Sequence, residues 1–259
     1  MILGNIILNI RFDFGVSRVN NIKKICVFGD SISKGVTIDT ISRHYTMSKN
    51  SFVNLLSDCE PWLNVKNYSM FGCTISKGLS LISRHMKDVD SSDAILLEYG
   101  GNDSDFDWAA VASAPDEKHL PKTPLDDFAE SYRTIIEHLR GQGKKIIMLN
   151  LPPIDEKKYF TWLGDGLNRE NIIKWLGGDI HYIYEFHDGY NAKVCEISSE
   201  YGIPLIDIRS EFLRQGDYSN LLCFDGIHPN EKGHALIAQT ILDYIPSLYY
   251  CLTLEDAAV

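Results

Sequence analysis

The segment KKICVFGDSISKGV, Lys23 to Val36, carries a run of apolar residues that stops at a glycine, an aspartate and a serine. A short apolar run of this kind predicts a buried strand, and Gly, Asp and Ser are typical of turns and helix starts. Ser31 therefore has two interpretations. It is either the N-cap of a helix, a position that Ser favours, or a nucleophile at the end of a strand. A nucleophile needs a base and donors for an oxyanion, which other parts of the chain must supply.

Apolar runs alternate with helical patterns along most of the chain, and this alternation predicts a parallel, doubly wound α/β sheet. Several runs, such as AILLEYG and KKIIMLNLPP, are continuously apolar, as expected for strands that are covered on both faces. The expected strands are 25–28, 65–68, 94–99, 145–149 and 204–206. The expected helices are 52–57, 79–87, 124–140, 187–201 and 232–244.

Two segments interrupt this alternation, residues 104–123 and residues 154–184. Both follow a predicted strand, and in open α/β sheets the ligand lies outside the carboxyl ends of the strands. We therefore expect both segments to be substrate-binding loops. Their aromatic residues either form a small local core or line a pocket: Trp108, Tyr159, Phe160, Trp162, Trp175, Tyr182 and Tyr184.

The composition is that of an ordinary globular protein, with 259 residues, 44% hydrophobic and 23% charged, which suits one large domain. We expect that domain over residues 21–248, an N-terminal arm or strand over 1–20 and a C-terminal tail over 249–259. The net charge is −10, so the surface repels phosphate backbones and anionic lipids, and neither nucleic acid nor a membrane is an expected partner.

The N-terminal residues and the cysteines indicate the cellular compartment in which the protein is expected. The first 20 residues lack a basic start and are interrupted by Arg11 and Asp13, which favours a packing arm over a signal peptide and predicts the cytoplasm. The six cysteines are scattered without a C-x-x-C pair, which indicates reduced thiols. No H-E-x-x-H or similar ligand spacing occurs, so no metal or other cofactor is expected.

A possible base lies near the C-terminus in CFDGIHPNEKG, where Asp225 and His228 stand three residues apart before Pro229. Proline does not continue a preceding helix, so this segment is expected to be a loop or one turn. Within such a turn the Asp225 carboxylate can reach the His228 imidazole, fix its tautomer and stabilise its cation. Alternatively, Asp225 caps a helix and His228 lies on the surface.

Possible oxyanion donors follow two other predicted strands. In LLEYGGNDSDF a buried strand ends at two glycines, after which Asn102 offers a side-chain amide. In NYSMFGCTISKG, Gly72 offers a backbone N–H. For both segments an ordinary turn is the alternative, because Gly, Asn and Asp favour turns.

Taken in chain order, these elements resemble the SGNH hydrolase superfamily, also called GDSL-type esterases and lipases. The first block of the family is matched by Gly29, Asp30 and Ser31, followed by Ile32 where the family usually has leucine. The second block is matched at Asn67, Gly72 and Thr74, the third at Gly100, Asn102 and Asp103, and the last at Asp225 and His228. The resemblance runs from about Lys23 to Tyr244.

The resemblance implies a flavodoxin-like, three-layer α/β/α sandwich around a mainly parallel five-stranded sheet. It also implies a serine esterase site, in which Ser31 is the nucleophile, His228 the base and Asp225 the residue that orients the base. The oxyanion would be held by the N–H groups of Ser31 and Gly72 and by the side chain of Asn102. Asp30 and Asp103 would have supporting roles.

The expected function is that of a carboxylic ester hydrolase acting through an acyl-enzyme on a small-molecule or glycan ester. We expect short acyl groups, acetyl first, on a polar carrier such as a carbohydrate, because the segment after Ser31 is mixed and polar. One alternative is a lysophospholipase or thioesterase with the same catalytic groups. Another is a binding module without activity, which would have no need of all four matching side chains.

Overall fold

Five parallel strands form the central sheet of the protein, whose computed structural model describes residues 22–39, 41–164 and 166–256. The strand order is β4-β1-β5-β6-β7, and each neighbouring pair is parallel. The five strands lie within two residues of their predicted bounds, so the predicted α/β fold is confirmed. The strands are β1 (Lys24–Gly29), β4 (Asn64–Asn67), β5 (Ala94–Glu98), β6 (Lys145–Leu149) and β7 (Leu205–Ile206).

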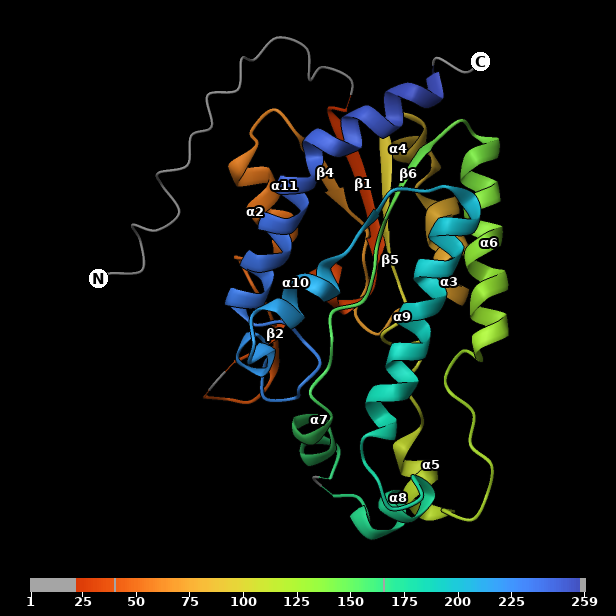
Figure 1. Cartoon of the computed structure of the whole chain (residues 1–259), viewed down its shortest axis with the longest axis vertical. Coiled ribbons are helices and arrows are strands. Elements are labelled where there is room, and N and C mark those ends of the chain that lie inside the picture. Colours follow the sequence, from red (N-terminus) through yellow and green to blue (C-terminus); the bar gives the residue numbers. More distant parts are fainter. Residues whose placement is uncertain (1–21, 40, 165, 257–259) are drawn as a thin grey trace, which may run out of the picture.

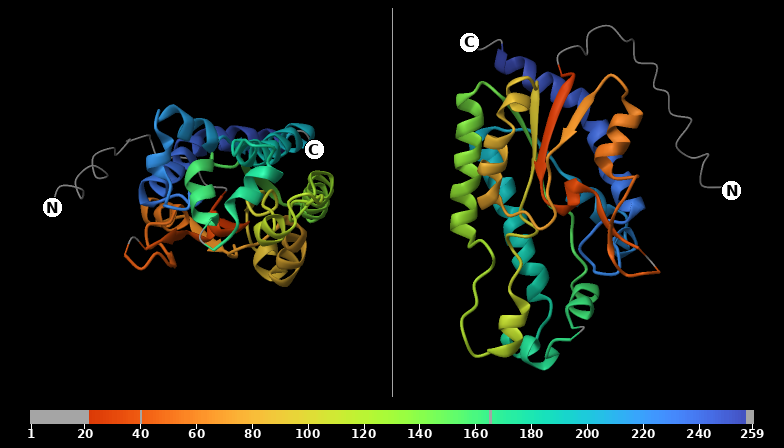
Figure 2. Two further views of the ribbon diagram at one scale, coloured as in Figure 1. Left: turned by 90° about the horizontal axis from the view of Figure 1, so that it is seen from below. Right: turned by 180° about the vertical axis from the view of Figure 1, so that it is seen from behind.

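Helices cover both faces of this sheet and make three layers (Figure 1). One face carries α3 (Ile75–Arg84), α6 (Leu125–Gly141) and α9 (Tyr182–Tyr201). The other carries α2 (Phe52–Cys59), α10 (Ile208–Arg214) and α11 (Glu231–Asp256). The two outer layers are also visible from behind in Figure 2.

Residue alternation along the strands explains why the sheet needs both layers. In β1, Cys26 and Phe28 belong to the core on the side of α3, α6 and α9, whereas Val27 belongs to the core on the opposite side. Every residue of β5 is buried. Because successive side chains of a strand point to opposite faces, continuously apolar strands bury both faces only between two layers of helices.

The two segments that interrupt the alternation fold as a small third unit beyond the carboxyl ends of the strands. They contain α5 (Trp108–Ser113), α7 (Glu156–Leu163) and α8 (Arg169–Trp175), which lie below the sheet in Figure 1. Their apolar side chains form a separate cluster, in which Trp108, Ile172 and Ile183 are buried. This cluster holds the two segments in place beyond the carboxyl edge of the sheet.

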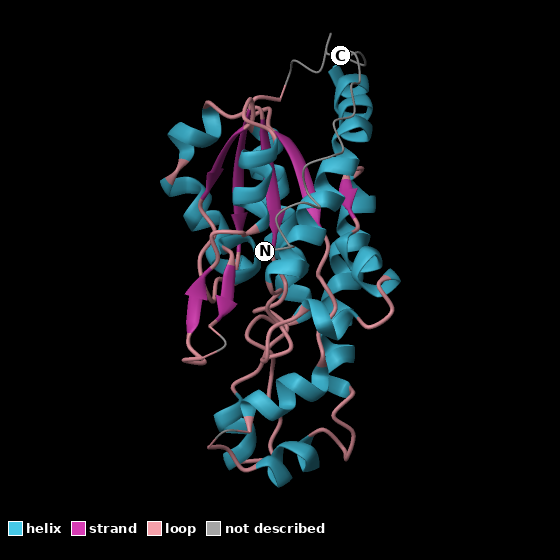
Figure 3. Cartoon of the chain, turned by 90° about the vertical axis from the view of Figure 1, so that its left-hand side faces the viewer, coloured by secondary structure: helices cyan, strands magenta, loops and turns pink. Residues whose placement is uncertain are grey.

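Several local features differ from the sequence-based expectations. The chain after Ser31 forms only one helical turn, α1 (Ser31–Lys34), and then a hairpin of β2 (Val36–Ile38) and β3 (Tyr45–Met47) that stands apart from the main sheet in Figure 3. The helix expected over 79–87 is divided at His85 into α3 and α4 (Met86–Asp90). A short 3-10 helix, η1 (Tyr218–Leu221), precedes the last loop.

The ends of the domain also differ in detail. α9 begins at Tyr182, ahead of the predicted start at residue 187. α11 continues to Asp256, across the boundary expected at residue 249. The arm expected over residues 1–20 lies outside the described residues.

Candidate active site

Ser31 lies immediately after β1, where the chain turns sharply from a strand into α1. Asp30 is the N-cap, and its Oδ1 accepts a hydrogen bond from the N–H of Ile32 at 2.8 Å. Gly35, with φ of 83°, ends the helix after one turn, because this left-handed conformation strongly favours glycine. A helix of one turn has only a small dipole. A negative charge beside Ser31 would therefore be stabilised mainly by individual backbone N–H groups.

Position 29 must be glycine for the turn to sit against the neighbouring strand. A Cβ on Gly29 would lie 2.6 Å from the carbonyl oxygen of Glu98 on β5. The absence of a side chain therefore allows β1 to approach β5 where the two strands end, and this brings Ser31 close to the loop that follows β5.

His228 and Asp225 approach Ser31 from the loop before α11. Nε2 of His228 lies 2.9 Å from Oγ of Ser31, and Nδ1 of His228 lies 2.5 Å from Oδ2 of Asp225. Oδ1 of Asp225 accepts the N–H groups of Ile227 and His228, both at 3.1 Å. The carboxylate is thus held by its own loop and can orient the imidazole toward Ser31, which is the geometry of a catalytic triad.

The same loop is closed by a glycine that no other residue could replace without strain. Gly226 has φ of 71°, and a Cβ there would lie 2.4 Å from the carbonyl oxygen of Asp155. Asp155 in turn donates its N–H to the carbonyl oxygen of Gly226 at 2.8 Å. The loop that carries Asp225 and His228 is therefore fixed against the start of α7.

Gly72 and Asn102 lie on either side of Ser31 because of the strand order. β1 is between β4 and β5 in the sheet, and Gly72 and Asn102 follow these two neighbours. Ser31, Gly72 and Asn102 all line one pocket. No acceptor among the described residues takes the backbone N–H of Ser31 or Gly72. These two N–H groups and the Asn102 amide are therefore suitably placed as oxyanion donors.

A buried pair of carboxyl groups, Asp30 and Glu98, lies beneath these donors. Oδ2 of Asp30 accepts a hydrogen bond from Nδ2 of Asn102 at 3.0 Å. Oε2 of Glu98 accepts two hydrogen bonds from Ser33, one from its Oγ at 2.7 Å and one from its backbone N–H at 3.2 Å. Burial raises the pKa of Asp30, and burial together with the charge of Asp30 raises the pKa of Glu98 well above its ordinary value. Burial and like charge both favour the protonated form, so this pair binds a proton more readily than two exposed carboxyl groups do.

Asp103 connects the loop after β5 to the start of α3. Its two carboxyl oxygens lie 3.0 and 3.2 Å from the N–H of Ile75, where the N-cap residue Thr74 makes no side-chain cap bond. Burial is the main reason that the pKa of Asp103 is raised to about 7. Asp103 thus supports the chain between Gly72 and α3 while standing next to Asn102.

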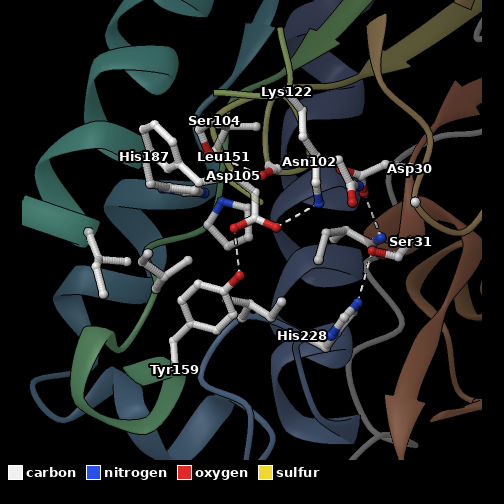
Figure 4. A pocket seen from close by; sticks show the side chains of 18 of the residues that line it. Asp30, Ser31, Asn102, Ser104, Asp105, Lys122, Leu151, Tyr159, His187 and His228 are labelled. Atoms are coloured by element: carbon white, nitrogen blue, oxygen red, sulfur yellow. Dashed lines mark hydrogen bonds and ion pairs between the residues drawn. The ribbon is translucent and has the colours of Figure 1, made fainter. Parts of the chain in front are cut away.

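The pocket that contains Ser31 has a volume of about 290 Å³ and draws its walls from most of the loops at this edge (Figure 4). Both interrupting segments contribute, as predicted. Asp105 is the centre of a polar network in the wall: its Oδ1 accepts Tyr159 Oη at 2.6 Å and Trp108 Nε1 at 2.7 Å, and its Oδ2 accepts Lys122 Nζ at 2.7 Å. The apolar part of the wall includes Phe71, Phe106, Leu151, Ile154, Trp162, Leu163, Ile183, Phe186 and Ile227.

Aromatic rings surround His228 at the mouth of the pocket. The Tyr45 ring meets the imidazole edge-on with centroids 5.2 Å apart, and the Phe71 ring stacks on it at 6.2 Å. Tyr45 also contacts the rings of Phe71 and Trp162. Tyr45 and Phe71 remain substantially exposed, so the mouth presents an apolar surface to solvent. This differs from the polar entrance expected from the composition of the segment after Ser31.

All seven residues predicted for the site lie together at the carboxyl edge of the sheet, either in the pocket or directly behind it. Four further residues line the pocket: Asp105 and Lys122 belong to the predicted binding segment 104–123, whereas Glu98 and His187 were not predicted for the site. Of these, His187 stands at the start of the helix predicted over 187–201 and had no predicted role in the site, whereas the structure places it, buried, in the pocket wall. Among the predicted aromatics, Trp108, Tyr159 and Trp162 line the pocket, whereas Phe160, Trp175 and Tyr184 pack in the local cluster.

In the described part of the chain, no three or more His, Cys, Asp or Glu side chains are placed to hold a metal ion. None of its helices combines the length and the apolar character needed to cross a membrane.

Sequence comparison places the chain in a known family. The model of the GDSL-like lipase/acylhydrolase family matches residues 27–236, and the chain belongs to this family. It is accordingly a carboxylic ester hydrolase, and the predicted SGNH resemblance is confirmed. The match begins within β1 and ends within α11, so it includes all four sequence blocks of the site.

Individual relatives are distant. The GDSL esterase/lipase CPRD49 of Arabidopsis thaliana is 26% identical over 191 residues, which cover 70% of this chain and 68% of that protein. The mouse isoamyl acetate-hydrolyzing esterase 1 homolog is 22% identical over 228 residues, covering 83% of this chain and 78% of that protein.

Solved structures share the fold at similarly low identity. A lipase/acylhydrolase from Enterococcus faecalis superposes with a TM-score of 0.62 at 19% identity, over 88% of this chain and 96% of that one. An acetylxylan esterase from Geobacillus stearothermophilus superposes with a TM-score of 0.57 at 18% identity, over 86% of this chain and 94% of that one.

Proposed function

We propose that the protein is a serine esterase in which Ser31, His228 and Asp225 form the catalytic triad. The observation that carries this proposal is the unbroken chain of contacts from Ser31 Oγ to His228 Nε2, at 2.9 Å, and from His228 Nδ1 to Asp225 Oδ2. His228 takes the proton of Ser31 as Oγ attacks the acyl carbon. It then donates this proton to the departing alcohol oxygen.

The oxyanion of the tetrahedral intermediate is held by the N–H groups of Ser31 and Gly72 and by Nδ2 of Asn102. These donors are already in place before the reaction, so little reorganisation accompanies the development of charge. Water, activated by His228, next attacks the acyl carbon. The acid is released and the proton returns to Ser31 Oγ. Asp225 keeps the imidazole in the tautomer that both steps require.

We further propose that the substrates are esters with short acyl groups, acetyl foremost. The pocket volume of about 290 Å³ is at the lower end of the range for small-molecule sites. Its walls include bulky aromatic and aliphatic side chains such as Phe106, Trp162 and Phe186. The names of two similar proteins, an isoamyl acetate-hydrolyzing esterase homolog and an acetylxylan esterase, also support acetyl esters.

The carrier of the acyl group is proposed to be polar, such as a carbohydrate. Lys122 and Asp105 form an ion pair in the pocket wall at 2.7 Å, and the Lys122 side chain is 44% exposed. Such a pair offers both a donor and an acceptor to hydroxyl groups. Aromatic rings at the mouth, including Tyr45 and Trp162, provide faces on which a sugar ring can stack.

One observation favours the alternative, a lysophospholipase or thioesterase. Apolar side chains are exposed on the β2–β3 hairpin and the neighbouring loop, among them Met47 at 51% and Phe71 at 55%. An exposed apolar surface beside an active site is what an enzyme acting on long acyl chains would use. A short-acyl esterase and a lysophospholipase or thioesterase can be distinguished by the length of the acyl chain that each one favours.

A chain-length series of p-nitrophenyl esters tests the proposed substrate class. We expect kcat/KM to peak between acetate and butyrate and to fall steeply by octanoate. Each methylene that fits an apolar pocket adds about 0.8 kcal/mol, whereas one that does not fit loses this gain. A maximum at octanoate or longer would reject the short-acyl proposal and favour the alternative. The Ser31→Ala variant is the control for hydrolysis that does not use the site.

A further inference from the structure

His187 lies in the first turns of α9 and forms part of the wall of the Ser31 pocket. It is 6% exposed, so more than nine tenths of the residue is buried. In Figure 4 it stands on the side of the pocket opposite to Ser31 and His228, with Asn102 and Asp105 between them. Ser31 Oγ has His228 as its hydrogen-bond partner and makes no hydrogen bond with His187, which lines the space that a bound ester would fill.

The His187 imidazole has no hydrogen-bond partner among the described residues. Its Nδ1 is buried without one, and no hydrogen bond joins Nε2 to a described residue. Burial, followed by the nearby charge of Arg209, lowers the pKa of His187 to about 3. The ring is consequently neutral at physiological pH and presents one N–H donor and one lone pair.

The neighbours of His187 in the pocket wall offer no hydrogen-bond partner to Nε2. Ile183 and Phe186, on the same helix, and Leu151 across the pocket are apolar lining residues. Arg209, whose charge contributes to the lowered pKa of His187, directs Nη2 to Asp188 at 2.8 Å and to the Tyr184 hydroxyl, while its Nη1 is buried without a hydrogen-bond partner. Nδ1 is closed off, but Nε2 retains accessible surface, so a ligand in the pocket can supply the hydrogen bond that Nε2 lacks.

We propose that His187 is a specificity-determining residue that hydrogen-bonds a hydroxyl group of the substrate at the end of the pocket away from His228. A hydroxyl both donates and accepts, so it can pair with Nε2 whether this nitrogen carries the proton or the lone pair. An uncharged ring gives no reason to select a charged substrate group. The inference rests on the proposed esterase function and narrows its substrates to hydroxylated esters.

The hydroxyl can belong to the acyl part or to the alcohol part of the ester, and two pairs of substrates distinguish these. The acyl pair is p-nitrophenyl butyrate and p-nitrophenyl hydroxybutyrate. The alcohol pair is propyl acetate and glycerol monoacetate. For each pair the measured quantity is the ratio of kcat/KM for the hydroxylated ester to kcat/KM for the plain one. In the wild-type protein this ratio is expected to exceed one in at least one pair.

In His187→Phe, which keeps a ring of similar size but has no hydrogen-bonding groups, the ratio is expected to fall by about three- to tenfold in that pair. His187→Gln retains a donor and an acceptor, so it is expected to keep part of the preference. This variant also tests the proposal if the Phe variant does not fold. The matched control is His234→Phe, because His234 is likewise buried with a lowered pKa but lies on α11 outside the pocket. Its ratio is expected to equal that of the wild type.

The outcomes separate the inference from the function on which it rests. A wild-type protein that hydrolyses no ester would overturn the proposed function itself. Hydrolysis of the plain esters without preference in either pair would overturn only the role of His187. The same follows if both His187 variants retain the wild-type ratio in both pairs. Loss of the preference in the His187 variants, with the control unchanged, supports the inference and identifies the part of the ester that carries the hydroxyl.

Discussion

Nδ2 of Asn102 donates to Oδ2 of Asp30 across 3.0 Å, although the two residues are 72 positions apart in the chain. One hydrogen of the amide is thereby fixed beneath the pocket, and the geometry of the planar amide directs its second hydrogen elsewhere. The N-cap of α1 and the proposed oxyanion donor are thus parts of one arrangement. A change in either residue should affect the same step of the reaction.

Replacing Asn102 by Ala is expected to lower kcat by roughly 10²–10³-fold, as for other single oxyanion donors. Substrate binding should change much less, because the amide acts mainly on charge that develops in the transition state. Steady-state kinetics on p-nitrophenyl acetate measure both quantities. Asn54→Ala, at an exposed position on α2, is the control. An unchanged kcat in Asn102→Ala would mean that Asn102 is only a turn residue.

A fluorophosphonate is expected to label Ser31 covalently, because His228 is placed to remove its proton and the neighbouring N–H groups can hold the phosphoryl oxygen. Intact-protein mass spectrometry should show one added group on the wild type and none on Ser31→Ala. The tryptic peptide that contains Ser31 also contains Ser33, so fragment spectra must assign the site. Ser33 Oγ is occupied by Glu98, and a label found there would contradict the proposed nucleophile.

Much of this site could be predicted because Ser31, Gly72 and Asn102 each follow a strand of the sheet. Parallel strands end at a common edge, so residues that follow β1, β4 and β5 come together wherever these strands are neighbours. The contact between Asp225 and His228 is also local, since both lie in one short loop. Residues that follow a strand, or that share one short loop, can be located from the sequence without knowledge of how distant elements pack.

Residues whose roles depend on packing between distant elements could not be placed in this way. In the sequence, Glu98 is one polar residue in an otherwise apolar strand. Only the pairing of β1 with β5 shows that it lies beside Asp30. His187 was assigned to the very start of a helix, because the helical pattern is weak before it. The earlier start of α9, at Tyr182, is what turns Ile183, Phe186 and His187 into one wall of the pocket.

The stability of the protein is expected to depend on the ionisation of Asp103. Burial raises its pKa from 3.8 to about 7, so the folded protein keeps a proton that the unfolded chain releases. The contribution of this group to stability is complete below about pH 4 and is lost as the pH rises through about 7. Asp103→Asn does not titrate. Relative to this variant, the wild type should lose up to about 1.4 kcal/mol of unfolding free energy per pH unit in that window.

Urea unfolding at several pH values between about 4 and 7 measures this difference. Asp103→Asn still offers one side-chain oxygen to the Ile75 N–H, so α3 keeps an acceptor at its start. Asp126→Asn, at an exposed position in the first turn of α6, is the matched control and should leave the wild-type slope in place. Parallel curves for wild type and Asp103→Asn would show that Asp103 is ionised throughout the window.

Glu98 is expected to limit activity on the alkaline side. It is fully buried, and its pKa is raised well above its ordinary value, first by burial and then by the charge of Asp30, so it holds its proton to a higher pH than an exposed carboxyl group does. When this proton is lost, two negative charges lie beneath the site where the oxyanion develops. Like charges disfavour each other most strongly in a desolvated region. We therefore expect kcat of the wild type to decline as Glu98 ionises.

Replacing Glu98 by Gln tests this expectation directly. The amide oxygen can accept from Ser33 as the carboxyl does, and the amide hydrogens can serve the neighbouring Asp30, so the variant resembles the protonated acid at every pH. Its kcat near neutral pH should stay close to that of the wild type, while its plateau extends further into alkaline conditions. The measurement is kcat on p-nitrophenyl acetate between about pH 6 and 10, corrected for spontaneous hydrolysis. If both proteins lose activity at the same alkaline pH, ionisation of Glu98 is not the cause.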